Sequence, residues 1–185
     1  MTIFALILLV SILTNFYANA GSTGDDIANA QDNILATAVA QSWAQTAQGL
    51  AFDNVTDTSD VAFQNPSVLT AGNALGVEPG ENKDSVSTYN DFDDFNNLKL
   101  CYHSDLPGDS DATPGYIQIK VPGIRAKYYV TCIVQYVNPP NLDAPYTIRQ
   151  TWHKKLTVTV TSPSATGITG KPDTLVYPAI MSYWN

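Results

Sequence analysis

The sequence predicts an α+β fold: a long, interrupted N-terminal hydrophobic helix, or stem, followed by an antiparallel β-sheet head. Three observations lead to this prediction. Residues 1–20 carry no charge, residues 25–49 place apolar side chains at helical spacing, and alternating apolar and polar residues recur through 98–185. We therefore expect helices first and a sheet afterwards, which is the order typical of an α+β chain.

The first twenty residues form an uncharged and mostly apolar segment, MTIFALILLVSILTNFYANA. As a helix they would extend about 30 Å, roughly the hydrocarbon thickness of a bilayer. A helix that is apolar on every side is stable only in lipid or among other apolar helices. If this stem is retained, its filament-core residues are Ile3, Phe4, Leu6, Ile7, Leu8, Leu9, Val10, Ile12 and Leu13.

A cleaved signal peptide is the alternative interpretation of the same segment. Ala18 and Ala20 supply the small residues of a cleavage site, which would end the signal at Ala20. However, a signal peptide begins with positive charge, and the chain has no Lys or Arg before Lys83. The sequence therefore favours retention.

A helix break is expected at residues 21–24, because Gly21 and Gly24 each disfavour continuous helix by about 1 kcal/mol. A second helix would then run to about Gly49. Its expected apolar stripe consists of Ile27, Ile34, Leu35, Ala38, Val39, Trp43 and Leu50. The whole stem would cover residues 1–52.

The head is expected over residues 53–185, with an irregular connection at 53–97 that is rich in turn-forming residues and carries short strands. Antiparallel strands should then fill residues 98–185. They are expected at residues 98–102, 116–121, 127–137, 147–152, 155–161 and 175–184. In the strand around Leu156, apolar residues alternate with threonines, which predicts one buried and one wet face.

Charge argues against a nucleic-acid partner. The formal net charge is -8, from 9 Lys and Arg against 17 Asp and Glu, and eight acidic residues precede the first basic one. A polyanion would be repelled by such a surface.

Cys101 and Cys132 are the only cysteines. In an exported chain they would form a disulfide between two strands, and two buried free thiols are the alternative.

Several segments together resemble type IV pilins and their minor pilin and pseudopilin relatives. They are the uncharged N-terminal run, the break after it, the run Leu50-Ala51-Phe52-Asp53, the acidic segment 90–96 and the strand 154–163. This resemblance implies a structural subunit of an extracellular helical filament, or pilus, that polymerises with copies of itself through its N-terminal helix. It also implies transient insertion into the inner membrane before assembly at the cell surface.

The family's stems carry a Glu at the fifth mature position, and here that position is Ala5. The resemblance therefore implies either a divergent bacterial branch whose subunit assembles without this charge pair, or a likeness in architecture without the standard assembly machinery.

Catalysis is not expected, and no cofactor is implied. His103 and His153 are the only histidines, and the chain has neither a nucleophile elbow nor a phosphate-binding loop. Asp91, Asp93 and Asp94 form a weak calcium candidate, since carboxylates are calcium ligands. The alternative is an Asx-rich turn that Phe92 and Phe95 pin to the head.

Asn54 begins the sequon Asn54-Val55-Thr56, a candidate glycosylation site. A second functional hypothesis is a secreted β-sandwich binding or adhesion module, released from a signal peptide at Ala20. In either case the strand aromatics are candidates for contact with surface glycans, although such residues more often belong to a core: Tyr128, Tyr129, Tyr136, Tyr146 and Trp152.

Overall fold

A computed structural model describes residues 27, 29–58, 65–104, 113–122, 124, 127–146, 148–166 and 172–183. The chain divides into two compact units, Met1–Leu35 and Ala36–Asn185. The second unit therefore includes residues 36–52, which the sequence had assigned to the stem. The packing described below is that of the second unit.

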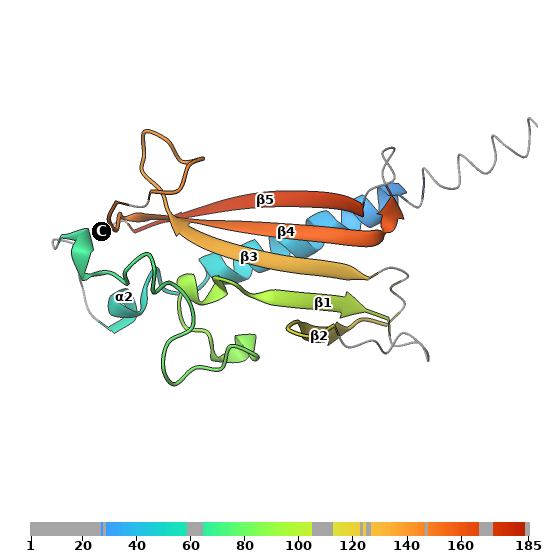
Figure 1. Cartoon of the computed structure of the whole chain (residues 1–185), viewed down its shortest axis with the longest axis horizontal. Helices are drawn as coiled ribbons and strands as arrows, with labels where there is room; N and C mark the ends of the chain where they lie inside the picture. Colours follow the sequence, from blue (N-terminus) through green and yellow to red (C-terminus); the bar gives the residue numbers. More distant parts are fainter. Residues whose placement is uncertain are drawn as a thin grey trace, which may run out of the picture. The chain divides into compact units, whose positions relative to one another are not determined.

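A five-stranded mixed sheet forms the centre of this unit (Figure 1). The strands lie in the order β2-β1-β3-β4-β5. Their bounds are Lys99–His103 for β1, Ile117–Lys120 for β2, Tyr128–Tyr136 for β3, His153–Thr166 for β4 and Pro172–Ser182 for β5. Neighbouring strands are antiparallel except for β1 and β2, which are parallel.

The predicted fold class is wrong in two respects. The sheet is mixed and not antiparallel, because β1 and β2 pair in the parallel sense. Residues 104–116 separate the two strands in the sequence, and a connection of this length permits parallel pairing. The described part also has no long apolar stem helix: its long helix covers residues 29–48. None of the described helices is long and apolar enough to span a bilayer. Residues 1–20, the apolar run of the predicted stem, and the break at Gly21 and Gly24 lie outside the described residues.

Most of the predicted strands are present, but residues 148–152, within the strand expected at 147–152, form none. The alternation expected in β4 is confirmed. Leu156, Val158 and Val160 are buried, while the threonines between them lie on the outer face of the sheet and are half-buried. Alternate residues of a strand point to opposite faces, so the inner face of the sheet is apolar.

From Ala36 onward, the long helix covers this inner face (Figure 1). Its buried residues are alanines at helical spacing: Ala36, Ala40, Ala44 and Ala47. Small side chains allow the helix to lie close to the strands, and the indole Nε1 of Trp43 donates a hydrogen bond of 2.7 Å to the Tyr102 hydroxyl on β1. The buried stripe therefore differs from the predicted one. Ile34 and Leu35, which were expected in it, are exposed.

The described residues between 53 and 97 form the short helix α2, Asn54–Thr58, and three turns of 3-10 helix: η1, Pro66–Val68; η2, Val86–Thr88; and η3, Asp93–Phe95. Apart from isolated bridges, the described residues of this segment form no strand, so the short strands expected here are not found.

The predicted disulfide is wrong. Cys101 and Cys132 are both buried free thiols. The strand register explains why. Cys101 on β1 lies opposite Tyr129 on β3 and therefore shares its face of the sheet. Cys132 lies three residues further along β3 than Tyr129, so its side chain points to the other face. Cys132 instead shares the inner face with Val130 and Val134. Side chains on opposite faces of one sheet cannot be bridged without moving the backbone.

We expect both thiols to react in unfolded protein that has never been reduced, and Cys132 to be unreactive in the folded protein. Burial raises the pKa of the Cys132 thiol to about 12, so that almost no thiolate, the reactive form, is present at neutral pH. Thiol labelling before and after denaturation measures this. A Cys132→Ala variant is the matched control and should lose one labelled thiol on unfolding. Failure of the denatured chain to label would contradict the register.

Candidate functional site

A lysine lies in the core of the domain. Lys154 is the second residue of β4 and points to the same face as Leu156, and its side chain is 0% exposed. An isolated ammonium group in an apolar interior is too unfavourable to persist, so its surroundings must compensate its charge.

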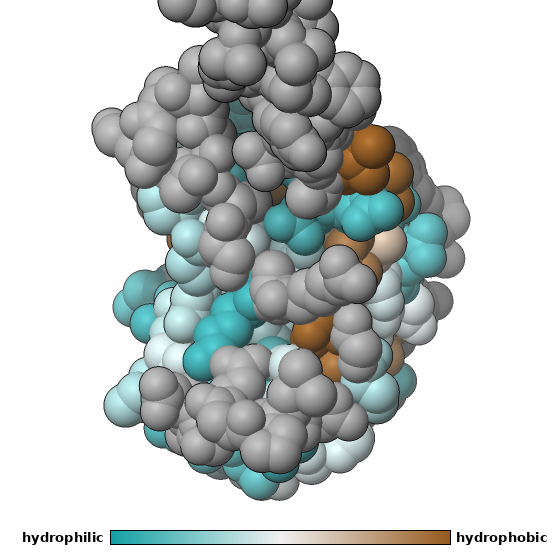
Figure 2. Space-filling view, turned by 90° about the vertical axis from the view of Figure 1, so that its right-hand side faces the viewer, coloured by the Kyte–Doolittle hydropathy of each residue, from teal (hydrophilic) through white to brown (hydrophobic). Residues whose placement is uncertain are grey.

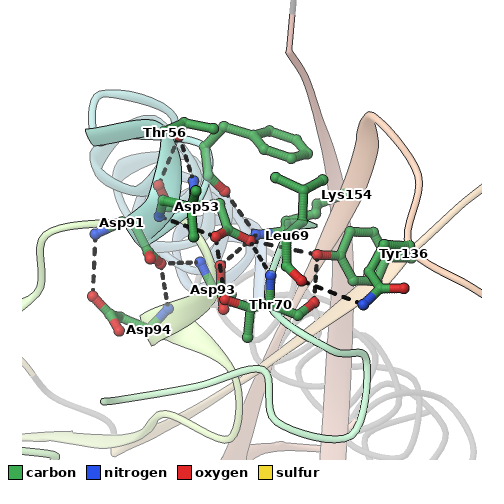
Figure 3. Close-up of polar contacts among 12 residues, drawn as sticks. Asp53, Thr56, Leu69, Thr70, Asp91, Asp93, Asp94, Tyr136 and Lys154 are labelled. Carbon is green, nitrogen blue, oxygen red and sulfur yellow. Dashed lines mark hydrogen bonds and ion pairs between the residues drawn. The ribbon is translucent and has the colours of Figure 1, made fainter. Parts of the chain in front are cut away.

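Three oxygens surround the ammonium group (Figure 3). Lys154 Nζ donates hydrogen bonds of 2.8 Å to the carbonyl oxygen of Phe52 and of 2.8 Å to Asp53 Oδ2, and a third to Asp93 Oδ1. Both carboxylates are fully buried. The Phe52 ring centroid lies 4.6 Å from Nζ, close enough for a cation-π contact. We call Lys154, Asp53 and Asp93 the charge centre.

Asp53 is held in place by the turn that begins α2. Its Oδ1 accepts a hydrogen bond of 3.2 Å from the Val55 amide, and its Oδ2 accepts one of 3.0 Å from the Thr70 amide. The Tyr136 hydroxyl of β3 donates to the Thr70 carbonyl at 2.8 Å and lies 3.5 Å from Asp53 Oδ2. Both Asp53 oxygens are therefore satisfied.

Asp91 and Asp94 form a reciprocal turn around η3. Asp91 Oδ1 accepts from the amides of Asp93 and Asp94 at 2.8 and 3.3 Å, while Asp94 Oδ2 accepts from the amides of Asn90 and Asp91 at 2.9 and 3.1 Å. The rings of the two phenylalanines in this turn, Phe92 and Phe95, are fully buried in the core. The expected Asx turn, pinned by its aromatic residues, is thus confirmed.

Two glutamates approach this turn from the segment before η2. The Glu78 amide donates to Glu81 Oε2 at 3.0 Å, across a turn in which Gly80 has φ +115°, a backbone conformation that favours glycine. Carboxylate oxygens of Glu78, Glu81 and Asp94 lie within 4.8 Å of one another, as do those of Glu78, Asp91 and Asp93. We call these five residues, Glu78, Glu81, Asp91, Asp93 and Asp94, the acidic cluster.

Crowding and burial disfavour ionisation of this cluster. Burial, followed by the charges of neighbouring aspartates, raises the pKa of Asp91 to about 8 and that of Glu78 to about 9. Burial also raises the pKa of Asp93, although the ammonium group of Lys154 acts in the opposite direction. Lys154 therefore does not neutralise the cluster.

The acidic cluster borders an open cleft of about 850 Å³, whose walls include Glu78, Glu81 and the exposed Asp84. Solvent and small ions in this cleft reach the glutamates first.

The structure brings together Asp91, Asp93 and Asp94, the weak calcium candidate. Asn54 is half-buried on α2. The histidines lie elsewhere: the ring of His103 contacts the Ser104 carbonyl at 2.9 Å, and that of His153 contacts the Ser182 hydroxyl at 2.8 Å. The filament-core residues 3–13 lie outside the described residues.

Of the aromatic candidates for glycan contact, Tyr128 and Tyr136 are core residues. Tyr129 and Trp152 are half-buried and pack against Tyr116 and Tyr183.

Sequence reasoning missed Lys154, Asp53, Glu78 and Glu81. One signal could have revealed the lysine: Lys154 precedes Leu156 by two positions, and so occupies the inward-facing position of a strand with strict alternation. The contribution of the glutamates had no such signal, because it depends on the folding of a long irregular segment.

Comparisons with protein-family models, with curated proteins and with solved structures find no match.

We expect Lys154→Met to lower the free energy of unfolding by about 3–5 kcal/mol, because it leaves buried carboxylates without their cation. Lys155→Met is the matched control. That side chain is on the outer face and donates only to the exposed carbonyl of Asp143, so the change should be within about 0.5 kcal/mol. Denaturant unfolding measures both variants, and equal effects would contradict the assigned role of the charge centre.

We expect the free energy of unfolding to fall between about pH 4 and pH 9 when divalent cations are removed by chelation. In the unfolded chain, Asp91 and Glu78 lose their protons near pH 4, whereas in the folded protein they hold them to about pH 8 and pH 9. The folded state binds more protons throughout this window, so its advantage is complete below pH 4 and disappears as pH rises through 8 to 9.

Asp91→Asn should flatten this dependence, since the amide oxygen still accepts from the η3 amides but does not titrate. Asp84→Asn, on the exposed side of the cleft, should leave the pH dependence unchanged. Denaturant unfolding at a series of pH values tests both, and stability that rises over the window would show that the cluster is ionised without penalty.

Proposed function

We propose that the chain is a non-catalytic structural subunit of an extracellular filament, which assembles through its apolar N-terminal segment and presents the sheet domain as a head. One observation carries the proposal. Twenty uncharged residues at the N-terminus are followed by exposed apolar side chains, at Ile27 and, on the first turns of the long helix, at Ile34 and Leu35. A run of this kind is unfavourable in water unless another molecule covers it.

Copies of the same chain are suitable partners for this segment. Full burial of one apolar side chain such as Leu or Ile contributes about 1.5–3 kcal/mol, so the nine residues of the predicted filament core together outweigh the entropy lost on association, about 4–15 kcal/mol. The segment also contains no charge that would require a partner of opposite sign. The resemblance to type IV pilins supports this assignment. Transient insertion into the inner membrane would precede assembly at the cell surface.

A secreted binding module is the second candidate, and exposed apolar side chains on the outer face of the sheet favour it. Ile133, Val176 and Ile180 are exposed among the threonines of β3, β4 and β5. Figure 2 shows hydrophobic surface (brown) beside hydrophilic surface (teal) on one face of the described part. In this case the native protein would begin at Gly21 after cleavage. N-terminal sequencing of the native protein distinguishes the two candidates, because a retained stem begins upstream of Gly21.

We expect Ile34→Asp to reduce filament assembly while the head still folds. Ile34 is 71% exposed in the single chain, so the new carboxylate is harmless there but unfavourable once a partner covers the helix. Ile148→Asp is the matched control, because Ile148 is 76% exposed on the head and should tolerate the same change. Sedimentation and electron microscopy of the two variants measure assembly, and circular dichroism measures folding.

A further arm tests the N-terminal segment itself. Removal of the residues before Asp25 should abolish filaments. The proposal is wrong if the truncated chain still polymerises, or if Ile34→Asp enters filaments as well as Ile148→Asp does.

A further inference from the structure

The geometry points to a calcium-binding site formed by the acidic cluster of Glu78, Glu81, Asp91, Asp93 and Asp94. This inference does not depend on the proposed filament, since it concerns only the sheet domain. It rests on buried carboxylate oxygens that lack a hydrogen-bond partner, and not merely on the number of acidic residues.

Each of the five carboxylates has one buried oxygen without a hydrogen-bond partner: Glu78 Oε2, Glu81 Oε1, Asp91 Oδ2, Asp93 Oδ2 and Asp94 Oδ1. The three aspartates are fully buried. Buried polar atoms are almost always paired, because each unpaired one loses its hydration without compensation. These oxygens belong to two groups of three carboxylates that share Glu78, and such groups indicate a positive partner held between the carboxylates.

The second oxygen of each aspartate is engaged, and this organises the site. Asp91 Oδ1 and Asp94 Oδ2 accept from backbone amides of their own turn, and Asp93 Oδ1 accepts from Lys154. The carboxylates are thereby oriented before an ion arrives. A prearranged set of ligands loses little conformational entropy on binding.

Ligand type favours calcium. The cluster offers only oxygen atoms, which hard cations such as Ca²⁺ and Mg²⁺ prefer, and it lacks the His and Cys ligands typical of zinc. Oxygens within 4.8 Å of one another can reach one ion, and Ca²⁺ accepts several carboxylate oxygens in flexible geometry. Mg²⁺ demands near-ideal octahedral geometry and retains several waters, so a set of ligands made of carboxylates alone suits it less well.

Charge leads to the same ion. Of the five carboxylates only Asp93 contacts the Lys154 ammonium group, which is already shared with Asp53. A divalent cation is the smallest partner that reduces this excess of negative charge while satisfying several oxygens at once.

The site also has an entry path. Glu78 and Glu81 line the open cleft, whereas the aspartates lie behind them in the core. An ion bound here would connect the glutamate turn to η3, and through Asp93 to Lys154 on β4. Calcium would therefore brace the irregular segment against the sheet.

The test uses the full chain, treated with EDTA and dialysed into chelator-free buffer. Equilibrium dialysis with radioactive calcium should show saturable binding, and about 1 mM CaCl₂, an extracellular level, should raise the Tm more than MgCl₂ at the same concentration. No binding, no rise in Tm, or a larger rise with MgCl₂ would overturn the assignment.

Glu78→Gln is the decisive variant, because it preserves shape and removes one ligand charge at the cleft. We expect it to weaken calcium binding by about tenfold or more, and to raise the Tm of the metal-free protein by relieving repulsion. A purely structural acidic cluster would show the second effect without any response to calcium. Asp84→Asn in the same cleft is the matched control, and its calcium affinity should stay within about twofold of the unmodified chain. Equal affinities for the two variants would also overturn the proposal.

Discussion

The rest of the domain depends on the neutralisation of one buried ammonium group. Lys154 enters the core because β4 alternates strictly, and its hydrogen bonds then join segments about a hundred and about sixty residues away in sequence. The Phe52-Asp53 corner and the η3 turn are both fastened to the sheet at this point. A buried pair of this kind contributes little net stability compared with apolar packing, but loss of one partner is severe. Its value lies in specifying where an otherwise irregular segment must lie.

The same region carries more negative charge than Lys154 can balance. Protons or a cation must supply the remainder, so the stability of the head is linked to its solution conditions. Both routes act on one joint between the irregular segment and the sheet. In an extracellular filament, where calcium is abundant, bound calcium would make this joint of the solvent-exposed head rigid. In a metal-free compartment at neutral pH it would be the weakest part of the fold.

The long helix shows a division between its two parts. From Ala36 onward, alanines face the strands and permit a close approach, while Trp43 joins the helix to β1. Before Ala36, the apolar residues Ile27, Ile34 and Leu35 are exposed. The exposed apolar side chains and the packed alanines therefore lie in separate segments of the chain, on either side of residue 36.

The sequence alone determined what depends on local periodicity: most of the strands, the wet and buried faces of β4, and the Asx turn pinned by Phe92 and Phe95. Alternation along a strand and the turn preferences of Asp and Asn are properties of neighbouring residues, so they can be read without the fold. The parallel pairing of β1 and β2, the separation of Cys101 from Cys132 and the meeting of Lys154 with Asp53 were decided only by the tertiary structure. Each depends on which strands pair and in which register, and pairing is fixed by packing between distant segments that no local pattern encodes. The acidic cluster combines the two cases. Its aspartates stand in one short run of the sequence, whereas Glu78 and Glu81 come close to them only because the folded chain places their turn beside η3.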